Sequence, residues 1–185
     1  MFHYIINMDE VIWFKDCSYK NKHLVGGKCS SLGELYNISK QIGFCIGDGF
    51  ALTTNLYDQF IQKNKLEKSI EQKLEEIDTS NLEILENQCQ ELRDLVSQGS
   101  FTEEMVQAIV VNYEKLCKQY HLPNMEVAIR SSALAEDLPN ASFAGQHDTF
   151  LNVSGQEMLL QNIKDCFASL FNTRAVSYRK THNIP

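Results

Sequence analysis

The sequence predicts an α+β fold in which a helical insertion interrupts a region of short strands and helices. Apolar runs of strand length occur towards both ends of the chain, at residues 11–14 and 127–129. Between them, over about residues 55–121, apolar residues recur at the three- and four-residue spacing of helices. We therefore expect the flanking parts to form the sheet and the middle to pack as helices.

The first part of the chain predicts a strand, a glycine turn and a helix. The apolar run at 11–14 is followed by "VGGKCSSLGEL", in which Gly26 and Gly27 precede a run of helical character. "GFALTTNLYDQFI" then reads as a second strand that leads directly into a helix.

Capping patterns predict where two later helices begin. Ser80 and Glu83 have the spacing of a capping box, as do Ser154 and Glu157, and the helix after Ser154 is expected to run to about Arg179. Two apolar stripes are predicted core: Leu82, Leu85, Cys89, Leu92 and Val96, and Met105, Ile109, Tyr113, Leu116 and Tyr120. The run at 127–129 predicts a buried strand, and "DTFLNV" predicts its partner.

Composition argues against nucleic acid and membranes as partners. The 185 residues carry a net charge of −7. The electrostatic field of the whole chain therefore repels an anion, and binding one requires a local cluster of donors. No apolar run approaches the roughly 20 residues that span a bilayer. The first ten residues lack the pattern of a signal peptide. The six cysteines show no zinc-binding spacing, which predicts reduced, mostly buried thiols and a cytoplasmic protein.

The glycine pair before Lys28 is a candidate anion site. Glycine lets backbone N–H groups approach an anion closely, and a helix that starts near Lys28 adds its dipole. Lys28 would then supply a mobile positive charge to a phosphate. The motif lacks the earlier glycine that a Walker A loop requires, and a glycine turn with a surface lysine is the alternative.

A second candidate begins at Arg130, which ends the predicted strand. A guanidinium matches phosphate in a bidentate way, and Ser131 and Ser132 add hydroxyls and N–H groups beside it. The small residues that follow suit a loop lying over a ligand, to which Gly145, Gln146 and Thr149 would add backbone and side-chain contacts. The alternative is a surface loop in which Arg130 pairs with Glu136 or Asp137.

These segments carry a family resemblance. "LVGGKCSSLGEL", "VAIRSSALAEDLPNASFAGQHDTFLNV" and "CFASLFNTRAVSYR" resemble the nucleotide-binding domain of phosphoenolpyruvate synthase (pyruvate, water dikinase), a family that includes pyruvate phosphate dikinase and rifampin phosphotransferase. The resemblance implies the first part of an ATP-grasp domain over residues 1–185, with Lys28 and Arg130 as catalytic contacts to the phosphates of ATP. It also implies that the loop ending in Gly145, Gln146 and Thr149 closes over the phosphates. His147 stands where the family usually has glutamine.

The resemblance further implies the chemistry of the family. ATP and water convert pyruvate to phosphoenolpyruvate, AMP and phosphate through a phosphohistidine. Mg²⁺ ligands, the phosphohistidine domain and the pyruvate-binding domain are expected outside this chain, so pyruvate would be reached only through the remainder of the enzyme or a second chain. Two alternatives stay open: part of a related dikinase-type phosphotransferase, or a non-catalytic module that binds a nucleotide or a partner protein.

Overall fold

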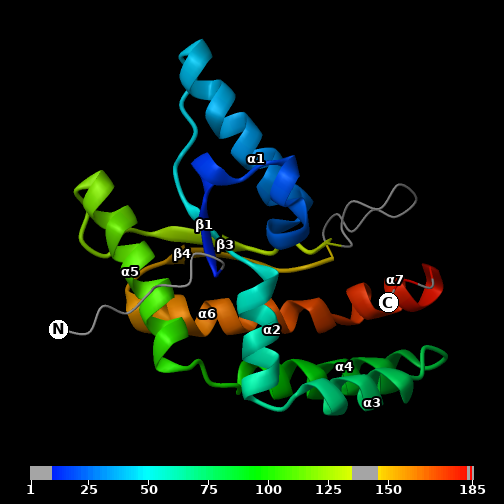
Figure 1. Ribbon diagram of the computed structural model, residues 1–185. Helices are drawn as coiled ribbons and strands as arrows, with labels where there is room; N and C mark the ends of the chain where they lie inside the picture. The colour runs from blue at the N-terminus through cyan, green and yellow to red at the C-terminus, as the bar shows by residue number, and fades with distance from the viewer. Residues whose placement is uncertain (1–9, 135–145, 183, 185) are drawn as a thin grey trace. The chain divides into compact units, whose positions relative to one another are not determined.

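The computed structural model describes residues 10–134, 146–182 and 184, and these divide into two compact units. Unit 1 comprises residues 10–59, 101–125 and 132–134, and unit 2 comprises residues 60–100, 126–131, 146–182 and 184. Each unit combines helices with one two-stranded sheet (Figure 1), so the α+β prediction is confirmed. The expectation that the flanking parts form one sheet around a helical insertion is corrected, because the described strands form two separate pairs and the helical middle of the chain is divided between the units.

Unit 1 contains an antiparallel pair of short strands and the helices that pack beside it. The pairing joins Val11 to Leu52 and Trp13 to Phe50. The elements are β1 (Val11–Trp13), the 3-10 turns η1 (Phe14–Asp16) and η2 (Tyr19–Asn21), α1 (Lys22–Ile42), β2 (Phe50–Leu52), the first part of α2 (Thr54–Lys63) and α5 (Glu103–Tyr120).

Trp13 ties the sheet of unit 1 to α5. Its indole Nε1 donates to Asn112 Oδ1 at 2.7 Å, and Lys115 Nζ lies 4.6 Å from the centre of its ring. The ring also packs against Phe50, with 5.7 Å between the ring centroids. Because the indole N–H is satisfied, this large side chain is buried without leaving an unpaired donor.

Unit 2 packs helices against the second antiparallel pair. Arg130 pairs with Thr149 and Ile129 with Phe150, and a bulge lies between Val127 and Ile129. The elements are the end of α2, α3 (Glu67–Glu75), α4 (Leu82–Ser97), β3 (Val127–Arg130), β4 (Thr149–Val153), α6 (Gln156–Ala168), the 3-10 turn η4 (Ser169–Phe171) and α7 (Thr173–His182).

Helix α4 packs against α6 (Figure 1). Both helices bury their apolar stripes. A polar contact fixes the pair at one end, because Ser97 Oγ donates to Asp165 Oδ1 at 2.6 Å. The predicted stripes are confirmed except at their ends, where Leu82 is 66% exposed and Tyr120 is 38% exposed. A residue at the end of a helix has packing neighbours on one side only, which explains why these two side chains remain exposed.

Both capping-box predictions are wrong. Asn81 caps α4 with its side-chain oxygen, which accepts from the amides of Glu83 and Ile84, whereas the Ser80 hydroxyl donates to Asp78 at 2.6 Å. The competing carboxylate thus removes Ser80 from the capping role. Gly155, with φ 80° and no side chain, occupies the cap position of α6.

Two further expectations are corrected by the structure. The helix expected to run to Arg179 ends at Ala168, and the chain passes through η4 before α7 begins at Thr173. The strand expected to be buried is only half-buried, since Val127 and Ile129 face inward while Ala128 is exposed. A two-stranded sheet covered on one side explains this alternation.

Within the described ranges, no helix combines the length and the apolar character needed to cross a bilayer.

Candidate functional site

In unit 1, the glycine pair breaks helix α1. Gly26 has φ 76° and ψ 171°, a conformation that only glycine adopts readily, so the long part of the helix begins just after it. A Cβ atom at this position would lie 1.7 Å from the backbone oxygen of Ser132. Gly26 is therefore required both by its backbone angles and by the close approach of Ser132.

Ser132 caps the helix that begins after this turn. Its Oγ accepts a hydrogen bond from the Cys29 amide at 3.0 Å. Lys28 is exposed beside this bond, in the first helical turn. A positive side chain and the N-terminal end of a helix therefore lie together, the arrangement that favours a bound anion. We refer to residues 26–29 as the glycine turn.

In unit 2, Arg130 and Thr149 are direct partners across the β3–β4 pair. Opposite residues of an antiparallel pair share one face of the sheet, and both of these are exposed. Ser131 continues the strand, and its Oγ lies 3.1 Å from His147 Nδ1. The end of β3 and the segment before β4 are thus joined by backbone pairing and by a side-chain contact.

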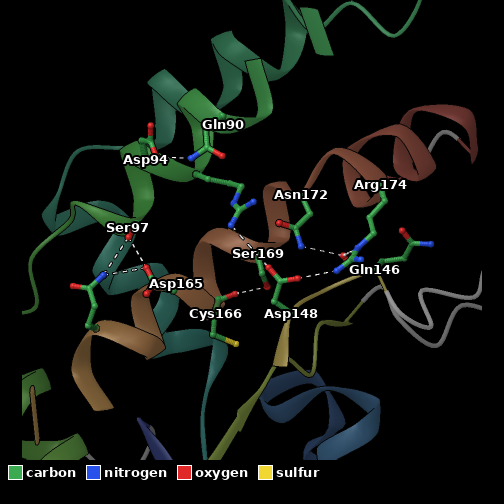
Figure 2. Close-up of polar contacts among 12 residues, drawn as sticks. Gln90, Asp94, Ser97, Gln146, Asp148, Asp165, Cys166, Ser169, Asn172 and Arg174 are labelled. Carbon is green, nitrogen blue, oxygen red and sulfur yellow. Dashed lines mark hydrogen bonds and ion pairs between the residues drawn. The ribbon is translucent and has the colours of Figure 1, made fainter. Parts of the chain in front are cut away.

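The segment before β4 is anchored to α7 (Figure 2). Arg174 donates from Nε to the backbone oxygen of Gln146 at 2.9 Å and from an Nη atom to Asp148 Oδ1 at 2.7 Å. Asn172 donates to the same Gln146 oxygen at 3.3 Å, and Arg93 of α4 approaches Asp148 at 4.0 Å. These contacts hold Gln146 and Asp148 in place immediately before Thr149.

Three buried polar atoms near this anchor have no hydrogen-bond partner within the described part of the chain. They are Gln146 Oε1, Asn172 Oδ1 and Arg93 Nε. Buried polar atoms in proteins are nearly always satisfied, so ordered water is the simplest partner for these groups.

The structure places most of the predicted site residues in two sets. Gly26, Gly27 and Lys28 form the glycine turn of unit 1, and the strand-end set of unit 2 consists of Arg130, Ser131, Gln146 and Thr149. Gly145 lies outside the described residues, as do Glu136 and Asp137, the alternative partners of Arg130.

Sequence reasoning placed Ser132 beside Arg130 as a donor, but it missed that the Ser132 hydroxyl caps the helix after the glycine turn. It also missed two residues that position the strand-end set. These are Asp148 and Arg174, and their charges are the one signal that a pairing was available. Among the described residues, no three His, Cys, Asp or Glu side chains gather closely enough to hold a metal ion.

Comparison with known proteins identifies the family. The model of the pyruvate phosphate dikinase AMP/ATP-binding domain matches residues 22–185. The chain is 41% identical over 177 residues to phosphoenolpyruvate synthase of Helicobacter pylori, with 96% of this chain and 22% of that protein covered. It is 42% identical over 170 residues to phosphoenolpyruvate synthase of Aquifex aeolicus, with 92% of this chain and 20% of that protein covered. The chain thus spans about a fifth of the length of these relatives, and it belongs to the family of the pyruvate phosphate dikinase AMP/ATP-binding domain.

Proposed function

We propose that this chain is an ATP-binding segment of a phosphoenolpyruvate synthase and forms the first part of an ATP-grasp domain. The main support for the proposal is the glycine turn. The backbone conformation of Gly26 places the N-terminus of a helix beside the exposed Lys28. The family match and the names of the relatives add support. The sequence segments that resemble the family include both residue sets described above.

We assign phosphate binding to each residue set separately. In unit 1, the amides that follow Gly26 and Gly27 and the ammonium group of Lys28 would attract a phosphate through the helix dipole and a full charge. In unit 2, Arg130 would bind phosphate in a bidentate way, with hydroxyls from Ser131 and Thr149 beside it. Gln146 and Gly145 would belong to the loop that closes over the ligand.

The reaction of the whole enzyme is part of the proposal. ATP, pyruvate and water would give phosphoenolpyruvate, AMP and phosphate through a phosphohistidine, in the cytoplasm. Lys28 and Arg130 would stabilise the negative charge that develops on the transferred phosphates. The described residues offer no cluster of three His, Cys, Asp or Glu side chains that would fit Mg²⁺. Its ligands, like the pyruvate site, would come from the remainder of the enzyme or a second chain.

The test is a calorimetric titration of the purified chain with ATP. Lys28→Met and Arg130→Ala should each weaken binding by roughly 10- to 100-fold, because a hydrogen bond to a charged group contributes about 1.5–3 kcal/mol. Lys20→Met is the matched control, since Lys20 is also an exposed lysine of unit 1, and it should leave the affinity unchanged. Equal affinity in all four proteins would overturn the proposed sites.

The double variant tests whether both residues bind one triphosphate. If Lys28 and Arg130 contact the same phosphate group, their effects on the binding free energy should be non-additive. Strict additivity would point to separate groups.

An assay of the 185 residues alone for pyruvate-dependent AMP formation should give no product, because the relatives that carry the activity in their names are about five times longer.

A further inference from the structure

Two buried cysteines lie in contact, and one of them is the last residue of the glycine turn. Cys17 follows η1 and Cys29 lies in the first turn of the helix after Gly26, and their Sγ atoms are 3.6 Å apart. Cys17 is fully buried, while Cys29 retains 8% of its exposure. Both belong to one apolar cluster with Val25. The sequence predicted buried thiols here but not their contact.

The distance between the sulfur atoms is short enough for a bond to form with local movement. A disulfide requires about 2.05 Å between the sulfurs, so the two atoms would have to approach by only about 1.6 Å. The Cys17 thiol lies 3.8 Å from the backbone oxygen of Ile12. The rest of the cluster around the pair is apolar and consists of Val25, Ile12, Phe14, Leu24 and Ala51. Soft contacts of this kind allow side-chain rotation more readily than a polar network would.

The environment makes the two thiols unequal. The hydrogen bond from Cys17 lowers the pKa of Cys29, and the start of the helix adds a further preference for a thiolate there. The same contact and the burial raise the pKa of Cys17. Cys29 is therefore the nucleophilic sulfur of the pair, and it is also the one that keeps some exposure.

We propose that Cys17 and Cys29 form a redox-sensitive dithiol that hydrogen peroxide converts into an intramolecular disulfide. The Cys29 thiolate attacks the peroxide oxygen, the O–O bond breaks, and the released oxygen leaves as water after protonation, which gives a sulfenic acid on Cys29. The Cys17 sulfur then attacks the Cys29 sulfur and releases the sulfenic oxygen as a second water. Two thiols lose two electrons and two protons, and one hydrogen peroxide gives two waters.

The disulfide would act on the glycine turn. Cys29 donates its amide to Ser132 Oγ, and Lys28 is the preceding residue. Drawing Cys29 towards Cys17 therefore displaces the first helical turn from the hydroxyl that caps it. This consequence depends on the proposed function, and we expect the dissociation constant for ATP to rise at least fivefold on oxidation.

The test begins with the full chain carrying Cys45→Ser, which removes the one exposed cysteine. Treatment with one equivalent of hydrogen peroxide should lower the intact mass by two hydrogens. Trypsin cuts after Lys20, Lys22 and Lys28, which all lie between the two cysteines, so the oxidised chain should give peptide 16–20 joined to peptide 29–40. Dithiothreitol should separate them. No joined peptide, or one that involves Cys89, Cys117 or Cys166, would overturn the proposal.

Single variants test the order of the two steps. In Cys17→Ala, dimedone should trap a sulfenic acid on Cys29, because the second thiol is missing. In Cys29→Ala, Cys17 should stay unmodified. Labelling of Cys17 alone would contradict the assignment of the nucleophile, and if either variant fails to fold, the peptide map of the Cys45→Ser chain still decides whether the dithiol exists.

ATP titration of the reduced and oxidised chains separates this proposal from the proposed function. If the reduced chain binds no ATP, the proposed function fails while the peptide map remains decisive for the disulfide. If both forms bind ATP equally, the dithiol stands and its effect on the glycine turn is refuted.

Discussion

Ser132 Oγ accepts a hydrogen bond from the Cys29 amide at 3.0 Å, although 103 residues separate them in the sequence. The same serine lies against Gly26, where it leaves no room for a side chain. The glycine turn is thus shaped by a contact with a residue distant in the sequence and not by its local sequence alone.

Gly26→Ala should be strongly destabilising. The backbone conformation of Gly26 is nearly exclusive to glycine, which costs other residues about 1–3 kcal/mol, and the new Cβ would also collide with the Ser132 backbone. We expect a loss of at least about 3 kcal/mol in the free energy of unfolding, measured by urea denaturation.

Two other glycines separate these effects. Gly43 has φ 73° but nothing within 4 Å of a built Cβ, so Gly43→Ala should cost about 1 kcal/mol from backbone strain alone. Gly47 has neither a positive φ nor a close neighbour, so Gly47→Ala should change stability by no more than about 0.5 kcal/mol. A loss at Gly26 no larger than that at Gly43 would contradict the close approach of Ser132.

Ser132→Ala should remove the cap of the helix after Gly26. Loss of a capping hydroxyl typically costs about 1 kcal/mol, and thermal or urea unfolding can resolve it. Ser100→Ala is the control, because Ser100 is exposed and its recorded hydrogen bonds use the backbone. If both substitutions have the same effect, the Ser132 hydroxyl contributes nothing to the cap.

Arg174 should matter more to stability than its ion pair alone suggests. Asp148→Asn weakens a pair whose side chains are 54% and 30% exposed, so we expect a loss below about 1 kcal/mol that shrinks further in high salt. Arg174→Ala also deprives the Gln146 backbone oxygen of a donor and should cost about 1–2 kcal/mol. An equal or larger loss in Asp148→Asn, measured by urea unfolding, would refute this ranking.

Tyr36 should make the chain sensitive to alkaline pH. Burial, together with the nearby Asp48, raises the pKa of Tyr36 from 10.0 to about 12. Because the pKa is raised in the folded state, the stabilising contribution is complete below about pH 10 and is lost as the pH rises through 12. The Tyr36→Phe variant has no phenol to ionise at this position. Its free energy of unfolding should therefore fall less over this range than that of the wild type, by a difference on the order of 2 kcal/mol.

The measurement is urea unfolding of both proteins between pH 9 and 12, which is the window set by the ordinary and raised pKa values. Tyr19→Phe is the control, since Tyr19 is 63% exposed. Parallel pH profiles for the wild type and Tyr36→Phe would show that the phenol ionises equally in the folded and unfolded states.

Elements whose signals are local could be predicted from the order of the residues. The apolar periodicity of α4 and α5 and the strand-to-helix step from β2 into α2 were predicted, because the repeat of apolar residues reports which face of an element is buried. The glycine pair also indicated a turn before a helix, since the φ angle of Gly26 is a property that glycine supplies on its own. The family resemblance then implied that these segments bind the phosphates of ATP.

Features that depend on contacts between distant residues follow only from the folded chain. The fold shows that Ser132 and not Ser131 reaches the glycine turn, that Cys17 touches Cys29, and that Arg174 holds the segment before β4. The cap of α4 differs from these, because it is a competition among neighbours: the Ser80 hydroxyl donates to the Asp78 carboxylate and leaves the capping role to Asn81. For the long-range pairs, a side-chain atom meets the partner that packing brings to it, and the order of its neighbours in the sequence does not reveal that partner.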